Sequence, residues 1–338
     1  MKVGTKKEIF DCLRGMKVYA PVGEKLRFGE VKSSDEIGSP ESIPLSPKEA
    51  FVPQDETLFF YDRPNDPSSI KEPADVERFA VWGLHPCDAK AMQLIGKVYT
   101  EGDYVDTYFA RRYEASVKIV IGCPNPRETC FCGSFDGMGP FSETGSDIFL
   151  IPLDSERFLV KGTTEIGEKL IASLPDATDE DIARGEEQKK HGEDTIDRSV
   201  PTEGLENTMQ ALFDNEDFWS DLYHRCLGCG ICTYVCPSCY CFDIQDERVG
   251  DKYRRYRVWD SCQFGLFTLE ASGHNPRPTQ KERIRQRMMH KLSFFKLRYG
   301  DDQLCVGCGR CVSECPVGID IRDVAKRADA FIKGGSNG

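Results

Sequence analysis

Hydrophobic and polar positions divide the chain into three stretches. Within residues 1–175, short apolar runs rich in β-branched and aromatic side chains predict strands. The clearest of these runs are 57–62, 78–86, 117–124, 147–153 and 157–162. Between two of them, residues 88–98 place Ala89, Met92 and Ile95 on one face, which predicts an amphipathic helix. Strands that alternate with helices predict an α/β or α+β domain for residues 1–175.

The pattern changes at residues 176–206, which contain eleven Asp or Glu residues, four Lys or Arg residues and few large apolar ones. This composition predicts an acidic linker or an exposed helix. Over residues 207–338, apolar side chains recur at helical spacing, most clearly in 209–223, 281–300 and 320–334. We therefore expect a mainly α-helical domain at the C-terminal end.

The cysteine content points to metal chemistry. The chain has 16 cysteines in 338 residues. Its first residues contain neither an apolar signal segment nor a small-residue cleavage site, and no apolar run is long enough to span a membrane. We expect a cytoplasmic protein without membrane contact, and the cytoplasm keeps thiols reduced. The net charge of −12 argues against a nucleic-acid partner, because phosphates require a basic surface.

Two segments, 226–237 and 305–316, share the spacing C-x2-C-x2-C-x3-C-P. In two-cluster ferredoxins, the first three cysteines of such a run hold one cluster and the fourth holds the other. We therefore predict two [4Fe-4S] clusters with crossed ligands. One ligand set is Cys226, Cys229, Cys232 and Cys315, and the other is Cys305, Cys308, Cys311 and Cys236. Two structural zinc sites are less favoured, because zinc usually takes two separated C-x2-C pairs.

Four further cysteines follow two of the predicted strands. Cys87 ends the run 78–86, and Cys123 follows the apolar part of the run 117–124. If both runs are parallel strands, these thiols emerge at the carboxyl edge of the sheet, where α/β folds commonly build sites. Cys130 and Cys132 follow through a loop that can fold back. The four thiols predict a third [4Fe-4S] cluster, with metal-free buried thiols or a zinc site as alternatives.

The C-terminal region contains three more cysteines, Cys239, Cys241 and Cys262. They either pack around a predicted cluster or form a fourth metal site with one additional ligand. The same region is locally basic at 252–257 and 281–298, although the whole chain is acidic. We interpret these basic stretches as solvated helix faces, as a docking surface, or as positive charge that eases cluster reduction.

Several signatures of catalytic chemistry are absent from the sequence. No G-x-G-x-x-G follows a predicted strand, so there is no Rossmann signature for NAD or FAD. Neither a nucleophile elbow nor a Walker loop occurs, and no two cysteines are adjacent. The chain by itself is therefore expected to move electrons rather than to make or break substrate bonds.

Five segments resemble one known family, which comprises an iron–sulfur subunit of anaerobic sulfite reductases and the beta subunit of sulfhydrogenases. These segments are 82–92, 108–140, 226–243, 259–279 and 305–320. Related subunits occur in flavin oxidoreductase–heterodisulfide reductase assemblies. The resemblance covers roughly residues 50–330 and implies a dicluster electron carrier without a catalytic site of its own.

The resemblance also implies partners. It implies a hetero-oligomeric, anaerobic redox complex in which the carrier connects a flavin subunit that oxidises NAD(P)H to a terminal reductase or hydrogenase subunit. The terminal reaction is not fixed by the resemblance, because sulfite reduction, hydrogen metabolism and disulfide reduction all use carriers of this type. The alternative is a self-contained iron–sulfur oxidoreductase that binds a flavin or a substrate directly.

Overall fold

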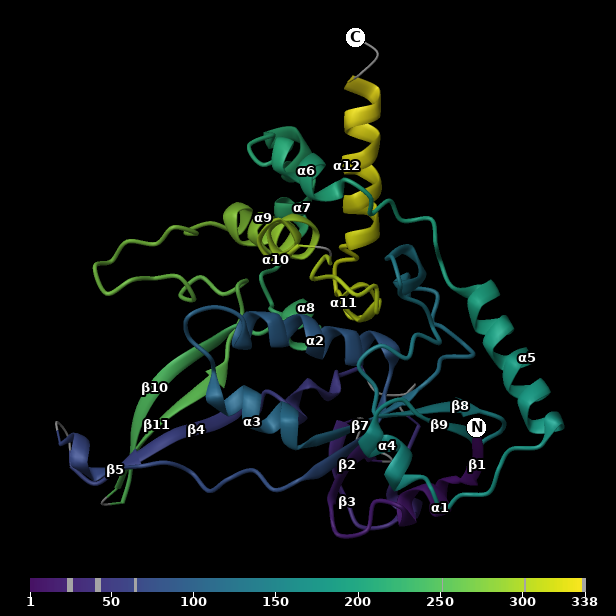
Figure 1. The fold of residues 1–338 in the computed structure, drawn as a ribbon. Helices are drawn as coiled ribbons and strands as arrows, with labels where there is room; N and C mark the ends of the chain where they lie inside the picture. Colours follow the sequence, from purple (N-terminus) through teal and green to yellow (C-terminus); the bar gives the residue numbers. More distant parts are fainter. Residues whose placement is uncertain (23–26, 40–43, 64–65, 251, 301, 336–338) are drawn as a thin grey trace.

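The computed structural model describes residues 1–22, 27–39, 44–63, 66–250, 252–300 and 302–335. In this part of the chain, two β-sheets lie below a group of helices in the view of Figure 1. One sheet has seven strands in the order β1-β9-β8-β7-β6-β2-β3, and the other has four in the order β10-β11-β4-β5. The mixed N-terminal region followed by a helical cysteine-rich region agrees with the predicted fold class.

The seven-stranded sheet lies in the N-terminal region. Its strands are β1 (Lys2–Thr5), β2 (Lys17–Val22), β3 (Arg27–Val31), β6 (Phe79–Leu84), β7 (Ser116–Ile121), β8 (Ile148–Pro152) and β9 (Arg157–Gly162). The central pairs β2–β6, β6–β7 and β7–β8 are parallel, whereas β1, β3 and β9 run antiparallel to their neighbours. The strands predicted at 78–86, 117–124, 147–153 and 157–162 are confirmed, whereas β1 to β3 were not predicted.

Helices cover both faces of this sheet. On one face lie α1 (Lys6–Asp11) and α4 (Glu165–Leu170), and on the other lie α2 (Pro86–Thr100), α3 (Thr107–Ala115) and α5 (Asp179–Thr195). Helix α5 falls inside the acidic stretch 176–206, where a linker or an exposed helix was expected. Its Gly185 lies close against Leu159 of β9, so one side of the acidic helix packs on the sheet.

The four-stranded sheet joins distant parts of the chain. It consists of β4 (Asp55–Tyr61), β5 (Ile70–Lys71), β10 (Phe242–Val249) and β11 (Lys252–Trp259). The strand predicted at 57–62 is confirmed as β4. The interpretation of residues 252–257 as a helix face is wrong, because they lie in β11. There Arg254 pairs with Asp55 and Arg257 pairs with Glu56, so carboxylates on the neighbouring strand stabilise the extended conformation.

The C-terminal helices are α6 (Leu205–Ala211), α7 (Glu216–Arg225), α8 (Ile231–Tyr234), α9 (Gln280–Met289), the π-helical turn η7 (His290–Phe294), α10 (Phe295–Tyr299), α11 (Arg310–Ser313) and α12 (Ile321–Gly335). The helix predicted at 320–334 is confirmed as α12, whereas the helices predicted at 209–223 and 281–300 are divided or interrupted. The helix expected at 209–223 is divided in two, because the Asn215 side chain caps α7 by accepting the Phe218 N–H at 2.9 Å. The helix expected at 281–300 contains the η7 turn.

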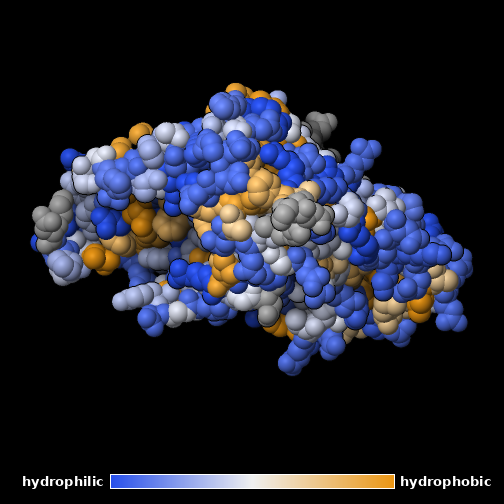
Figure 2. All heavy atoms as spheres, turned by 90° about the horizontal axis from the view of Figure 1, so that it is seen from above, coloured by the Kyte–Doolittle hydropathy of each residue, from blue (hydrophilic) through white to orange (hydrophobic). Residues whose placement is uncertain are grey.

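Short 3-10 helices complete the fold: η2 (Ser34–Glu36), η4 (Pro47–Ala50), η5 (Pro67–Ser69) and η6 (Cys132–Ser134). The surface seen from above is largely hydrophilic, with apolar side chains gathered in a few separate patches (Figure 2). Among the described residues, none of the helices has both the length and the apolar character that crossing a membrane would require.

Candidate metal centres

The two cysteine motifs have the same backbone conformation. Gly228 and Gly230 in the first motif have φ angles of 66° and 77°, and Gly307 and Gly309 in the second have 65° and 69°. These left-handed conformations favour glycine and curl each loop before the short helix that follows it, α8 or α11. The duplicated spacing in the sequence therefore corresponds to a duplicated loop geometry.

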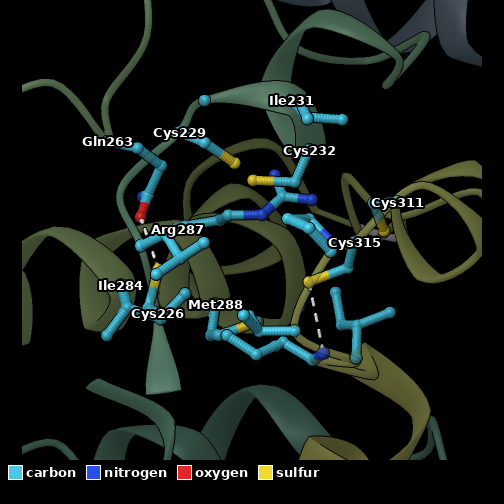
Figure 3. Close-up of a pocket in the computed structure, with 16 residues that line it drawn as sticks. Cys226, Cys229, Ile231, Cys232, Gln263, Ile284, Arg287, Met288, Cys311 and Cys315 are labelled. Carbon is cyan, nitrogen blue, oxygen red and sulfur yellow. Dashed lines mark hydrogen bonds between the residues drawn. The ribbon is translucent and has the colours of Figure 1, made fainter. Parts of the chain in front are cut away.

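The first centre lies in a small pocket formed by both motifs. A cavity of about 30 Å³ is lined by the predicted ligand set of Cys226, Cys229, Cys232 and Cys315, together with Cys311 of the other set (Figure 3). Two of these sulfurs accept hydrogen bonds: Cys226 Sγ from Gln280 Nε2 at 3.1 Å and Cys315 Sγ from Ile319 N at 3.2 Å. N–H···S bonds of this kind tune iron–sulfur centres. The structure thus brings the fourth cysteine of the second motif to the first motif.

The second centre is more deeply buried. Burial raises the pKa of the Cys305, Cys308 and Cys311 thiols to about 12 each, and the Cys236 thiol acts electrostatically on all three. The pKa of Cys236 itself lies well below the ordinary thiol value, because the Cys239 thiol donates a hydrogen bond to it and Lys291 lies nearby. The fourth cysteine of the first motif is therefore placed beside the second motif, and metal binding there would release protons.

The third group of thiols forms at the carboxyl edge of the large sheet. β6 and β7 are parallel neighbours, as the prediction that Cys87 and Cys123 emerge at one edge of the sheet required. A cavity of about 300 Å³ is lined by all four predicted cysteines, Cys87, Cys123, Cys130 and Cys132. Arg127 and Arg310 also line it, and Cys123 Sγ lies 3.0 Å from His85 Nδ1. Four thiols and positive charge fit an anionic iron–sulfur cluster.

The third group lies directly against the second motif. Phe131 N donates to Gly307 O at 2.8 Å, and Cys130 Sγ donates to Cys308 O at 3.6 Å. The Phe131 side chain enters the apolar core of the C-terminal helices, where it is 1% exposed. These contacts explain why the loop from Cys123 folds back, and they make the third site and the second centre immediate neighbours.

Three buried cations surround the C-terminal thiols. Lys48, Arg287 and Lys291 are each 3% exposed. Burial acts most strongly on all three and lowers the pKa of Lys48, whereas nearby thiols outweigh burial and raise the pKa of Arg287 and of Lys291. Among the residues that the structure describes, none of the three forms an ion pair with a carboxylate. Uncompensated buried charge is costly, so these cations fit beside anionic thiolate–iron groups.

These cations were only partly predictable. Arg287 and Lys291 are spaced i, i+4 within the basic stretch 281–298, and their burial agrees with the interpretation of positive charge near a cluster. That spacing, next to apolar Ile284 and Met288, was an available signal. Lys48 has no such signal, because it reaches the thiols from η4 in the N-terminal region.

The remaining cysteines divide into two groups. Cys239, Cys241 and Cys262 lie among the buried cations, whereas Cys12 lies apart, with its sulfur 4.0 Å from Ser173 Oγ. In the described residues, no three His, Cys, Asp or Glu side chains are close enough together to hold a single metal ion.

Comparisons with known proteins cover most of the chain. Residues 225–319 match the family described as "4Fe-4S dicluster domain". The chain is 32% identical over 321 residues to Sulfhydrogenase 2 subunit beta from Pyrococcus furiosus, covering 93% of this chain and 92% of that protein. No solved structure matched the chain significantly. The similarity to this relative therefore extends beyond the dicluster region into the N-terminal part of the chain.

Proposed function

Because the chain belongs to the family of iron–sulfur subunits that includes the sulfhydrogenase beta subunit, we propose that it relays electrons through [4Fe-4S] clusters. One observation carries the proposal: the second motif contributes to all three thiol groups. Its Cys315 lines the first pocket, and its Cys308 lines the cavity of the third group. The second centre thus lies between the other two, as consecutive one-electron carriers require.

The cluster count follows from the same thiols. Each crossed set supplies four ligands for one [4Fe-4S] cluster, and Cys87, Cys123, Cys130 and Cys132 supply four for a third. Bound clusters would serve as one-electron carriers, whereas the chain's residues position them and adjust their charge. Arg310 acts electrostatically on Cys308 and Cys87, although Asp88, to which it is ion-paired, offsets part of its charge.

The first centre provides a surface for a redox partner. Cys229 is exposed, Leu227 in the same pocket is 68% exposed, and Leu266 is 76% exposed. Ile231 and Phe264 add further exposed apolar area, and such patches favour protein contacts. We propose that this surface binds another subunit of a hetero-oligomeric complex.

The partner subunits follow from the electron count. NAD(P)H gives up electrons in pairs, whereas each cluster takes one, so a flavin subunit is needed to convert between them. We propose that this flavin subunit lies at one end of the relay, and that the other end meets a terminal reductase or hydrogenase subunit. The substrate chemistry then resides on those chains, and a cytoplasmic location remains our prediction.

Iron and sulfide counting on anaerobically purified protein tests the cluster assignment. A Cys130→Ala, Cys132→Ala double variant leaves too few thiols for the third site, so about four irons per chain should be lost. An unchanged iron content in the folded variant would refute the third cluster. Zinc in place of iron in the wild-type protein would refute the relay altogether.

A reduction assay tests the relay itself. NAD(P)H alone should leave the clusters of the purified chain oxidised, and addition of a flavoprotein NAD(P)H dehydrogenase should allow their reduction. Absorbance loss near the iron–sulfur band measures this step under anaerobic conditions. If the purified chain alone oxidised NAD(P)H with an artificial dye as acceptor, the self-contained oxidoreductase would be the better description.

A further inference from the structure

Three cysteines outside the predicted ligand sets come together through the β10–β11 hairpin. Cys241 directly precedes β10, and Phe242 at the start of β10 lies opposite Trp259 at the end of β11. Asp260 N donates to Cys241 O at 3.0 Å, which extends this pairing by one step. The chain then returns Cys262, two residues after Asp260, toward Cys241, and the two thiols are close enough to act on each other electrostatically.

Two of these sulfurs accept hydrogen bonds from nitrogen. Arg287 Nη1 donates to Cys239 Sγ at 3.7 Å, and Gln263 Nε2 donates to Cys262 Sγ at 3.6 Å. The Cys226 and Cys315 sulfurs of the first centre are bonded in the same way. N–H···S bonds favour sulfur that carries negative charge.

A buried cation faces this group from the N-terminal region. Lys48 Nζ donates to the carbonyl oxygens of Thr233, Cys236 and Cys239 at 3.1, 3.0 and 3.0 Å. Among thiols it interacts most strongly with Cys239, then with Cys236 and Cys241. Two of these three thiols lie outside the ferredoxin motifs. The two motif clusters therefore do not fully account for the position of this cation.

We propose that Cys239, Cys241 and Cys262 hold a fourth iron–sulfur cluster, beyond the centres that the proposed function requires. Three thiolates suffice for a [3Fe-4S] cluster, or for a [4Fe-4S] cluster whose fourth iron takes a non-cysteine ligand. Cys239 follows Cys236 by three residues and its backbone N–H donates to Cys236 O at 3.4 Å, which places this cluster next to the second centre. The fourth cluster is thus a side branch of the relay, with Lys48 and Arg287 offsetting its negative charge.

Metal analysis of the full chain tests this proposal. After anaerobic reconstitution, a Cys241→Ala, Cys262→Ala double variant should contain about three or four fewer irons than the wild type, with a matching loss of sulfide. Cys12→Ala, which removes a thiol remote from these groups, should lose none. An unchanged iron content in the double variant overturns the proposal, and so does a loss of zinc instead of iron.

The Cys130→Ala, Cys132→Ala variant provides a second measurement that does not depend on the folding of the first. With the third site removed, about eleven or twelve irons should remain if the fourth cluster exists. About eight irons, enough only for the two ferredoxin motifs, would overturn it. This comparison holds even if the third site binds no cluster, because the iron above eight then belongs to the fourth site alone.

Discussion

Arg310 and Asp88 form a buried two-point ion pair between the second cysteine motif and α2. Nη1 lies 2.6 Å from Oδ1 and Nη2 lies 2.9 Å from Oδ2, and the side chains are 5% and 1% exposed. Burial alone would raise the pKa of Asp88, but the Arg310 guanidinium holds it below its usual value. Because Asp88 directly follows Cys87, the pair fixes the third thiol group against the second centre.

Loss of either partner of this pair should be costly. Arg310→Met or Asp88→Asn leaves one buried group without its partner, and we expect a loss of about 3–5 kcal/mol in the free energy of unfolding. Asp88→Leu combined with Arg310→Met should cost less than the sum of the single changes. Because the pKa of Asp88 is lowered, the ionised carboxylate contributes its full stabilisation of the folded state at pH values above the ordinary carboxyl pKa. This stabilisation is lost as the pH falls through the lowered pKa. Thermal unfolding of anaerobic protein measures these differences.

A surface pair provides the control for that experiment. Arg111 and Glu72 form an ion pair with side chains 47% and 63% exposed, so Arg111→Met should cost no more than about 1 kcal/mol. Equal destabilisation by Arg310→Met and Arg111→Met would show that the buried pair has no special role.

Two glycines have nearly identical backbone conformations, so substitutions at both can separate the cost of backbone strain from the cost of a steric clash. Gly307 and Gly318 have φ angles of 65° and 66°, but a Cβ on Gly307 would lie 2.5 Å from Cys132 N, whereas a Cβ on Gly318 would meet nothing within 4 Å. Gly318→Ala should therefore cost about 1 kcal/mol from backbone strain alone. Gly307→Ala should cost more and should also reduce the iron content, because it pushes the Cys130–Cys132 loop away. Iron analysis and thermal unfolding of both variants compare the two effects, and equal behaviour would argue against the contact.

The crossed ligand sets can be distinguished spectroscopically. Cys315 lines the first pocket, so Cys315→Ala and Cys226→Ala should alter the same cluster signal. Cys236→Ala should instead alter the signal that Cys305→Ala alters. Electron paramagnetic resonance of the reduced variants, followed during redox titration, makes the assignment. If Cys315→Ala and Cys305→Ala changed one common signal, each motif would hold its own cluster without crossing.

Local patterns explain how much of the fold was predictable. The strands β4 and β6 to β9 follow from short apolar runs, and the thiols of Cys87 and Cys123 meet because β6 and β7 are adjacent and parallel. The pairing of β11 with β4 was not predictable, since it joins segments far apart in sequence and Arg257 finds its buried partner Glu56 only after folding. The composition of a basic stretch such as 252–257 does not distinguish a helix face from a strand, so it could not predict β11.

The candidate centres were likewise predictable where the signal is local, and not where it depends on contacts between distant segments. The ligand spacing of the duplicated motif is local, so its cysteines were identified from the sequence. The return of the loop to Cys130 depends on contacts between different regions of the chain, among them the backbone hydrogen bond from Phe131 N to Gly307 O. Lys48 reaches the carbonyl oxygens of Cys236 and Cys239 from the short helix η4, and no local pattern marks it.

Lys48 should influence the potential of the neighbouring clusters. A unit charge about 8 Å away in a medium of effective dielectric constant about 20 contributes about 2 kcal/mol, or on the order of 50–100 mV for one electron. Lys48→Met removes that positive charge. Its removal disfavours the additional negative charge of a reduced cluster, so at least one midpoint potential should fall by this amount.

Lys48→Gln also lacks the charge but retains an N–H donor for the carbonyl oxygens, so a fall in both variants assigns the effect to charge. Lys169→Met, which alters only an exposed pair with Glu165, should leave every potential unchanged. Redox titration with spectroscopic detection measures the shift, and potentials that stay fixed or rise in both Lys48 variants would mean that the charge does not act on a cluster.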